Sequence, residues 1–247
     1  MKKNKIRTDE LLCKQDLCAD IETARKKIMA GLVRVGNDYL VHNPSEKFSS
    51  ETALTLGTPC KYVSRGAFKL IPALDKYIPD LHGKTAVDIG ASTGGFTDLM
   101  LNRGIEKVYA VDVGYGQMHL RLRQDSRVVC MERVNARYFT ENSLPEKVDV
   151  MTMDVSFISV TKLLKAVNTI MKPDYWAFIL IKPQFEAERK DIEKGGVVRK
   201  QHVRDSCILK VKTFVENILD WTNLDVITSP ILGPKGNQEY ILVKIPN

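Results

Sequence analysis

A glycine-rich turn between an apolar strand and an apolar helix constrains the fold of this chain more than any other segment. The turn runs Asp88-Ile89-Gly90-Ala91-Ser92-Thr93-Gly94-Gly95-Phe96, with Thr85-Ala86-Val87 leading in and Thr97-Asp98-Leu99-Met100-Leu101 leading out. Such a turn lies at the carboxyl end of a parallel strand, where α/β sheets bind nucleotides. Its glycines let the backbone approach a ligand that a Cβ atom would repel. The segment therefore predicts a cofactor site at the edge of a parallel sheet.

The spacing of the glycines and a second carboxylate indicate which cofactor binds there. A dinucleotide fold would show G-x-G-x-x-G, whereas this turn lacks the second glycine, which lets a helix N-terminus approach a pyrophosphate. S-adenosylmethionine has no phosphate; Asp88 suits its ammonium group, and Asp112, at the end of the next apolar strand, suits its ribose. This cofactor is favoured, and a nicotinamide cofactor is the alternative. The predicted cofactor-binding residues are Asp88, Gly90, Ser92, Gly94, Gly95, Phe96 and Asp112.

Beyond residue 60, strand-like runs alternate with helical segments, which predicts a mostly parallel sheet with helices on both faces. The last two strands are joined by residues 230–236, too short for a crossover helix, so we expect them to pair antiparallel at the sheet edge. The fold class is therefore α/β, a Rossmann-like methyltransferase sheet. The predicted strands are 85–89, 107–112, 127–131, 148–153, 176–182, 224–229 and 239–245, and the predicted helices are 66–76, 94–103, 116–122, 159–171 and 202–219.

The first sixty residues predict a separate small α+β domain. Thr8 or Asp9 can cap a short helix, and Asp20 can cap a second helix that ends at Gly31. A hairpin follows around residues 36–38. The second helix carries basic residues opposite its apolar stripe, and this pattern favours RNA binding. The alternative is that these basic residues are only a solvated surface of the helix. We expect one domain over residues 1–60 and another over 61–247, with a linker near residues 59–61.

Composition limits the class of protein. The net charge of +7 and 44% hydrophobic content describe a basic globular chain, and no run approaches the ~20 apolar residues of a membrane span. The basic N-terminus is followed by Thr8-Asp9-Glu10 and not by an apolar signal core, so a cytoplasmic location is expected. The five cysteines are scattered and include no C-x-x-C pair, which argues against a metal site and against a disulfide framework.

The whole chain resembles the TlyA (hemolysin A) family of ribosomal RNA 2′-O-methyltransferases, in which an S4 RNA-binding domain precedes an FtsJ-like methyltransferase domain. The family linker often carries Arg-x-Trp-Val, where this chain has Cys60-Lys61-Tyr62-Val63. The matching segments are Arg7-Thr8-Asp9, residues 24–31 and 33–36 for the S4 domain, and residues 62–70, 88–97, 153–159 and 181–186 for the methyltransferase domain.

The resemblance implies a catalytic tetrad of Lys69, Asp154, Lys182 and Glu239, and no metal. A ribose 2′-oxygen would attack the methyl group of the sulfonium; we expect Lys182 to take its proton while the two carboxylates hold the lysines. Lys182-Pro183-Gln184-Phe185 stands where amino methyltransferases usually carry Asn or Asp before Pro-Pro-Tyr or Pro-Pro-Phe. A lysine in place of that amide or carboxylate favours an oxygen acceptor over a base nitrogen.

The implied substrate is ribosomal RNA or a ribosomal subunit, with cytidine as the target. A mobile loop is expected over residues 186–200, near the active site. Two alternatives stay open, a non-catalytic RNA-binding assembly factor and a membrane-active hemolysin. The predicted RNA-binding residues are Arg7, Arg25, Lys26, Lys27, Arg34, Arg65 and Arg189.

Overall fold

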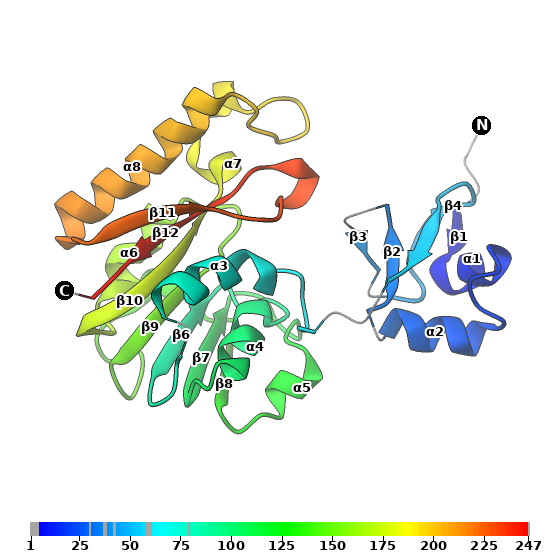
Figure 1. Cartoon of the computed structure of the whole chain (residues 1–247), viewed down its shortest axis with the longest axis horizontal. Helices are drawn as coiled ribbons and strands as arrows, with labels where there is room; N and C mark the ends of the chain where they lie inside the picture. The colour runs from blue at the N-terminus through cyan, green and yellow to red at the C-terminus, as the bar shows by residue number, and fades with distance from the viewer. Residues whose placement is uncertain are drawn as a thin grey trace. The chain divides into compact units, whose positions relative to one another are not determined.

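A computed structural model describes residues 5–29, 31–36, 39–41, 43–57, 61–78 and 80–246 (Figure 1). The chain divides into two compact units, Met1–Lys61 and Tyr62–Asn247. The first unit extends one residue beyond the domain end expected from the sequence. Whether this unit is an S4 domain stays a prediction.

The first unit packs two helices against two small antiparallel sheets. As predicted, Asp20 caps the second helix, because its Oδ1 accepts a 2.7 Å hydrogen bond from the backbone N–H of Thr23. Val33–Val35 pairs with Tyr39–Leu40 as a hairpin; Asn37 and Asp38 of the expected turn lie outside the described residues. The elements are β1 (Lys5–Arg7), α1 (Thr8–Lys14), α2 (Ile21–Met29), β2 (Val33–Val35), β3 (Tyr39–Leu40), β4 (Lys47–Ser49) and β5 (Leu54–Leu56).

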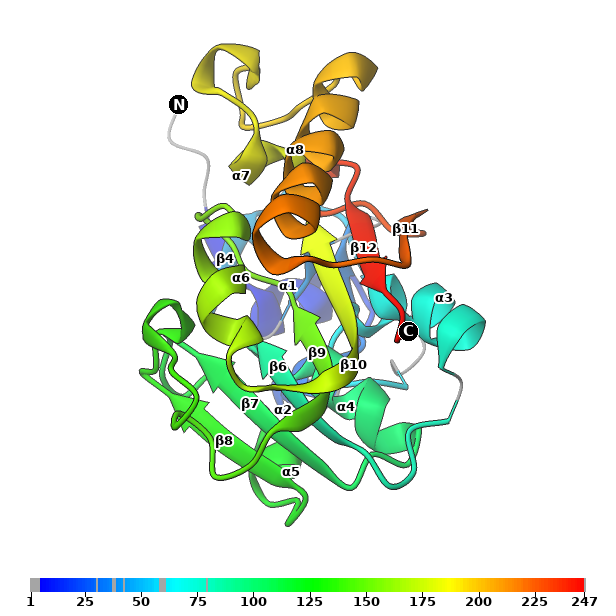
Figure 2. The ribbon, with the colours of Figure 1, turned by 90° about the vertical axis from the view of Figure 1, so that its left-hand side faces the viewer.

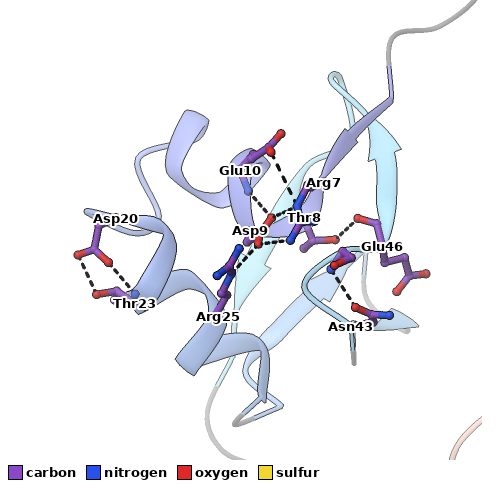
Figure 3. A network of polar contacts seen from close by, with 10 residues as sticks. Arg7, Thr8, Asp9, Glu10, Asp20, Thr23, Arg25, Asn43 and Glu46 are labelled. Atoms are coloured by element: carbon purple, nitrogen blue, oxygen red, sulfur yellow. Dashed lines mark hydrogen bonds and ion pairs between the residues drawn. The ribbon is translucent and has the colours of Figure 1, made fainter.

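A buried carboxylate joins the two helices of this unit (Figure 3). The Asp9 side chain is 0% exposed and accepts hydrogen bonds from Nε and Nη2 of Arg7 at 2.9 and 2.7 Å. Nε of Arg25, on α2, donates to the same carboxylate at 2.9 Å. The hydrogen bonds from Arg7 outweigh burial and lower the pKa of Asp9 to about 2. Asp9 is therefore a charged link between α1 and α2.

The second unit is built on a seven-stranded sheet in the order β11-β12-β10-β9-β6-β7-β8. The five strands from β10 to β8 run parallel to one another, and β12 runs antiparallel to both of its neighbours. The predicted sheet with an antiparallel last strand is confirmed. The strands are β6 (Thr85–Ile89), β7 (Lys107–Asp112), β8 (Val128–Glu132), β9 (Val148–Met153), β10 (Met171–Ile181), β11 (Leu224–Thr228) and β12 (Tyr240–Lys244).

Helices cover both faces of this sheet: α3 and α4 lie on one face, and α6 and α8 on the other (Figures 1 and 2). The main core packs apolar residues of the strands against Leu164 and Val167 of α6 and Val211 and Val215 of α8. The helices of this unit are α3 (Ala67–Tyr77), α4 (Gly95–Asn102), α5 (Leu120–Arg123), α6 (Thr161–Asn168), α7 (Pro183–Glu186) and α8 (Gln201–Leu219), with short 3₁₀ turns η1 (Ala136–Tyr138), η2 (Arg189–Asp191) and η3 (Pro234–Gly236).

Two elements differ from the expected boundaries. The helix expected over 116–122 is only the single turn α5, because residues 113–119 form the loop at the carboxyl end of β7. The helix expected over 159–171 ends at Asn168, and β10 begins at Met171 instead of residue 176. After the buried Met171, the residues Lys172-Pro173-Asp174 are all exposed, so they lack the apolar pattern by which a buried strand is predicted.

Candidate active site

The glycine turn brings two strand ends into close contact. Gly90 has φ +80°, and a Cβ atom there would lie 2.6 Å from the backbone oxygen of Asp154. A side chain at position 90 would therefore push the end of β6 away from the end of β9. Gly94 has φ +95°, and a Cβ atom there would lie 2.2 Å from Cδ1 of Leu122. Both positions need glycine for its backbone conformation and for space.

A pocket of 410 Å³ lies at the carboxyl ends of β6, β7 and β9, the edge where α/β sheets bind ligands. Three of the predicted cofactor-binding residues, Gly90, Ser92 and Asp112, are in its wall, together with the predicted catalytic residue Asp154. The remaining wall residues are Ile89, Val111, Val113, Gln117, Val134, Asn135, Ala136, Val155, Ser156, Phe157, Ile158 and Leu163.

Asp112 is held by backbone amides at the edge of this pocket. Its Oδ2 accepts from the N–H of Ser92 at 2.8 Å, and its Oδ1 accepts from the N–H of Gly114 at 2.7 Å. Each carboxylate oxygen can accept a further hydrogen bond. The half-buried carboxylate is thus fixed in place with acceptor capacity left for a pair of hydroxyl groups.

Asp88 lies behind the pocket wall, contrary to the expectation that it contacts the cofactor. Its carboxylate is 1% exposed and accepts hydrogen bonds from the N–H and hydroxyl of Thr97 at 3.0 and 2.7 Å and from the hydroxyl of Thr152 at 2.8 Å. Burial raises the pKa of Asp88 to about 6, although these hydrogen bonds oppose the rise. Asp88 therefore holds the start of α4 against β9.

Gly94, Gly95 and Phe96 are likewise absent from the pocket wall. All three are buried where α4 begins; the position of a Cβ atom on Gly95 would lie 3.0 Å from Oγ of Ser64. These residues therefore support the glycine turn through buried packing at the start of α4. Their contact with the cofactor stays a prediction.

The pocket wall also contains residues that were not predicted from the sequence, in the loops after β7, β8 and β9. Gln117 accepts a 3.2 Å hydrogen bond from the Ser92 hydroxyl, and Asn135 caps η1 by accepting from the N–H of Arg137. Phe157 has φ +66° and is 91% exposed, with its ring centroid 5.2 Å from that of Phe185. Each follows closely on a strand end at the ligand-binding edge, and Phe157 also lies in the family-matching segment 153–159; these are the sequence signals that could have found them.

The four residues of the implied tetrad form one chain of ion pairs beside the pocket. Nζ of Lys69 lies 2.7 Å from Oε2 of Glu239 and 3.5 Å from Oδ2 of Asp154. Nζ of Lys182 lies 2.5 Å from Oδ1 of Asp154 and donates to Oγ of Ser156 at 2.8 Å. The side chains of Lys69 and Lys182 are 10% and 8% exposed, that of Glu239 is 0% exposed, and that of Asp154 is 19% exposed.

The ion pairs keep Lys69 and Asp154 charged. Burial lowers the pKa of Lys69, but the carboxylates of Asp154 and Glu239 outweigh burial, so the pKa is raised above its ordinary value. Burial also raises the pKa of Asp154, but the ammonium groups of Lys69 and Lys182 lower it further, so the net pKa is below its ordinary value. Lys69 is therefore a poor proton acceptor and a good fixed cation.

Elements distant in sequence position these four side chains. Lys69 lies on α3, Asp154 and Lys182 follow β9 and β10, and Glu239 precedes β12. Glu186, 5% exposed, accepts from Oγ of Ser159 at 2.6 Å and from the N–H of Val160 at 2.8 Å. The turn after β10 is thus bound to the loop after β9, which sets the spacing between Lys182 and Asp154.

The segment 186–200, expected to be a mobile loop, has structure of its own. It contains η2 and a bridge between Glu193 and Val197, and Val198 packs with Val203 and Cys207 of α8. The segment is therefore anchored to α8 by apolar contacts. Arg189 lies exposed at the start of η2.

The predicted RNA-binding residues of the first unit differ in how they are held. Arg7 and Arg25 both bind Asp9. Lys26 pairs with Glu22 at 2.8 Å on the exposed face of α2, and Nζ of Lys27 donates to the backbone oxygen of Leu17 at 3.0 Å. Arg34 is half-buried on β2, and Arg65, in the second unit, is half-buried in the turn before α3.

Comparison with known proteins shows the family to which this site belongs. Residues 62–245 match the family described as FtsJ-like methyltransferase. The chain is a member of that family. It is 40% identical over 238 residues to the 16S/23S rRNA (cytidine-2′-O)-methyltransferase TlyA of Mycobacterium tuberculosis, covering 96% of this chain and 88% of the relative. It is 37% identical over 243 residues to Hemolysin A of Brachyspira hyodysenteriae, covering 96% and 98%.

A solved structure agrees with these sequence relatives. A hemolysin-named protein of Streptococcus thermophilus superposes with a TM-score of 0.73 at 38% identity, over 98% of this chain and 90% of that protein. The predicted resemblance to TlyA and hemolysin A proteins and the methyltransferase fold are confirmed. Within the part of the chain that the structure describes, no helix is both long and apolar enough to cross a membrane.

Proposed function

We propose that this protein transfers the methyl group of S-adenosylmethionine to a ribose 2′-hydroxyl of ribosomal RNA, with cytidine as the target nucleotide. The supporting observation is the Lys69–Glu239 and Lys182–Asp154 ion-pair chain, which adjoins a pocket at the ligand-binding edge of the sheet. The Mycobacterium tuberculosis relative is named for this reaction on 16S and 23S rRNA. The 2′-hydroxyl is the acceptor that best fits a site built around two lysine side chains, Lys69 and Lys182, each paired with a carboxylate.

The residues of the pocket fit the methyl donor. Asp112 has acceptor capacity for the two ribose hydroxyls. Gly90 exposes its backbone to the pocket, and a Cβ atom has no room there. Asp154, the tetrad residue that lines the pocket, adds a carboxylate to the wall. When bound, the donor supplies a methyl group already activated on a sulfonium. Asp88 has no part in this contact, since its carboxylate lies behind the wall.

The tetrad residues divide the work of proton transfer. Once its ammonium has lost a proton to solvent, the neutral amine of Lys182 accepts the proton of the 2′-hydroxyl, and Oδ1 of Asp154, at 2.5 Å, balances the ammonium charge that is formed again. Lys69 cannot take this role because its two carboxylates hold it charged. Lys69 and Glu239 instead fix Asp154 in place, so that part of the rate comes from holding the reacting oxygen in line.

RNA recognition is assigned to basic side chains of both units. Lys26 and Arg189 are exposed and suit phosphate contacts, whereas Arg7 and Arg25 first serve the buried Asp9. The exposed ring of Phe157 at the pocket wall suits stacking on an unpaired base. A ribosomal subunit would meet this protein in the cytoplasm, which is the location we propose.

The decisive experiment incubates the whole protein with labelled S-adenosylmethionine and unmodified ribosomal subunits, followed by digestion of the RNA to nucleosides. We expect label in 2′-O-methylcytidine at one or a few positions. Label on a base nitrogen would refute the proposed acceptor. RNA binding without any transfer would favour the assembly factor, and leakage of liposomes without the donor would favour a hemolysin.

A further inference from the structure

Asn237 stands out among the buried polar residues that the proposed reaction does not use. Its side chain is 1% exposed, and both ends of the carboxamide bind the backbone of a distant segment. Oδ1 accepts from the N–H of Val198 at 3.0 Å, and Nδ2 donates to the backbone oxygen of Gly196 at 2.9 Å. A buried amide satisfied in this way fixes two chain segments relative to each other.

The segment that Asn237 binds is the 193–198 turn, which follows η2. The turn is closed by the N–H of Glu193 donating to Val197 at 3.0 Å and by the N–H of Gly196 donating to Glu193 at 2.9 Å. Its far end is held by Val198, which is 2% exposed in the apolar cluster with α8. The turn also carries exposed Lys194 and is followed by exposed Lys200, two basic side chains that suit a polyanion, while Arg199 pairs with Glu193 of the turn at 3.0 Å.

Asn237 also ends a second turn, residues 233–237, that touches the tetrad. Its backbone oxygen accepts from the N–H of Gly233 at 2.8 Å. A Cβ atom on Gly233 would lie 2.0 Å from Oε1 of Glu239, so the backbone of this turn packs directly on the tetrad carboxylate. Glu239 in turn holds Lys69 at 2.7 Å.

We infer that Asn237 is a positioning residue for methyl transfer, coupling the 193–198 turn to the Glu239–Lys69 pair. The expected effect on the rate of methyl transfer rests on the proposed function. The coupling of the two turns rests on the hydrogen bonds of Asn237 alone. The two turns lie at the same end of the sheet (Figure 1), joined through one carboxamide. Displacing the 193–198 turn displaces the 233–237 turn and with it the carboxylate that orients Lys69. An ångström-scale shift of that kind is enough to reduce a rate severalfold to a hundredfold.

The test compares the whole wild-type protein with Asn237→Ala, Asn237→Asp and the control Asn217→Ala, whose side chain is exposed on α8. Asn237→Asp has the same shape and keeps the acceptor for Val198, but it places an oxygen against the oxygen of Gly196. Amide hydrogen exchange is measured on the donor-free proteins, and kcat, the KM for ribosomal subunits and the Kd for S-adenosylmethionine are measured beside it.

We expect faster exchange in both 193–199 and 233–239 in the two Asn237 variants, and in neither segment in Asn217→Ala. The kcat per folded molecule should fall about tenfold or more, while the Kd for the donor stays within about twofold because Asn237 is not in the pocket wall. Faster exchange in one segment only, or an unchanged kcat, would overturn the inference. Wild-type protein that transfers no methyl group would refute the proposed function alone, since hydrogen exchange still decides the coupling.

Discussion

At the scale of single residues, Lys182, the proposed proton acceptor, has one carboxylate partner where Lys69 has two. It is buried, it donates to Ser156, and one carboxylate oxygen of Asp154 lies 2.5 Å from its Nζ. Lys69 has two carboxylates and is held as a cation. The two lysines of the tetrad are therefore not equivalent, although they are the same residue type in the same site.

Replacing Lys182 by alanine should abolish most of the methyl transfer and spare binding. We expect kcat to fall by about 10² to 10⁴, the usual contribution of a positioned acid or base. Affinity for ribosomal subunits and for S-adenosylmethionine should stay within about threefold, since neither needs proton transfer. Lys165→Ala, on the exposed side of α6, is the control. A variant that keeps a tenth or more of the wild-type kcat would remove Lys182 from the proposed role.

Gly90 is a residue whose replacement tests the close contact of β6 and β9. Gly90→Ala adds a positive-φ penalty of about 1–3 kcal/mol and a Cβ atom 2.6 Å from the backbone oxygen of Asp154. Gly116→Ala is the matched control, because it has φ +70° with no atom within 4 Å of its Cβ position. Urea unfolding should show a larger loss of stability for Gly90→Ala, together with loss of donor binding. Equal losses in the two variants would contradict the steric argument.

At the scale of elements, Asp88 joins α4 to β9 and makes the second unit sensitive to pH. The folded pKa of about 6 lies above the ordinary value of 3.8, so the folded state binds the proton more tightly than the unfolded state. The unfolding free energy should therefore fall as pH rises from about 4 to 6, by about 3 kcal/mol if this group acted alone.

Asp88→Asn should remove that part of the pH dependence. The amide oxygen can still accept from the N–H and the hydroxyl of Thr97, while the amide N–H can donate to the hydroxyl of Thr152. Denaturant unfolding at several pH values between 4 and 7 measures the effect, with exposed Glu141→Gln as control. A slope in the Asp88→Asn variant as steep as in the wild type would assign the dependence to other groups.

Asp9 has the opposite sign of pH dependence in the first unit. Its folded pKa of about 2 lies below the ordinary value of 3.8, so its stabilising effect is present above about pH 4 and is lost as pH falls through 2. Asp9→Asn should lower the stability of this unit by about 1.5–3 kcal/mol at pH 7, since it weakens hydrogen bonds to two guanidinium groups. Hydrogen exchange of α1 and α2 would report it. Unchanged protection of both helices would show that the network adds nothing.

At the scale of the whole molecule, the net charge of +7 sets the conditions for RNA binding. Contacts of basic side chains with phosphates release counterions, so RNA affinity falls steeply with salt. Between 50 and 200 mM salt we expect a loss of about tenfold or more in affinity for ribosomal RNA, with donor affinity nearly unchanged. Fluorescence anisotropy and calorimetry measure the two. A salt-independent RNA affinity would argue against binding through basic side chains such as Lys26 and Arg189.

The architecture of the second unit was predictable because strands and helices leave local periodic patterns. The parallel order and the antiparallel last strand follow from connection lengths, which the sequence displays directly. The predicted boundaries were wrong at two elements, β10 and α5. Lys172-Pro173-Asp174 extends β10 as an exposed stretch, and the loop after β7 displaces the expected helix start. The pairing of β10 with β9 is irregular between Met171 and Trp176, and Val113 and Gln117 of the loop after β7 line the pocket, so neither boundary follows local propensity.

Sequence alone determined that this chain has a glycine turn at a strand end, a carboxylate on the next strand, and four motif residues at strand ends or on the entering helix. Only the tertiary structure decided which carboxylate faces the pocket: Asp112 does, and Asp88 is sealed behind it. It also decided that Asn237 joins two turns beside the tetrad. The physical reason is that periodicity reports local conformation, whereas burial and hydrogen-bond partners depend on segments brought together only by folding.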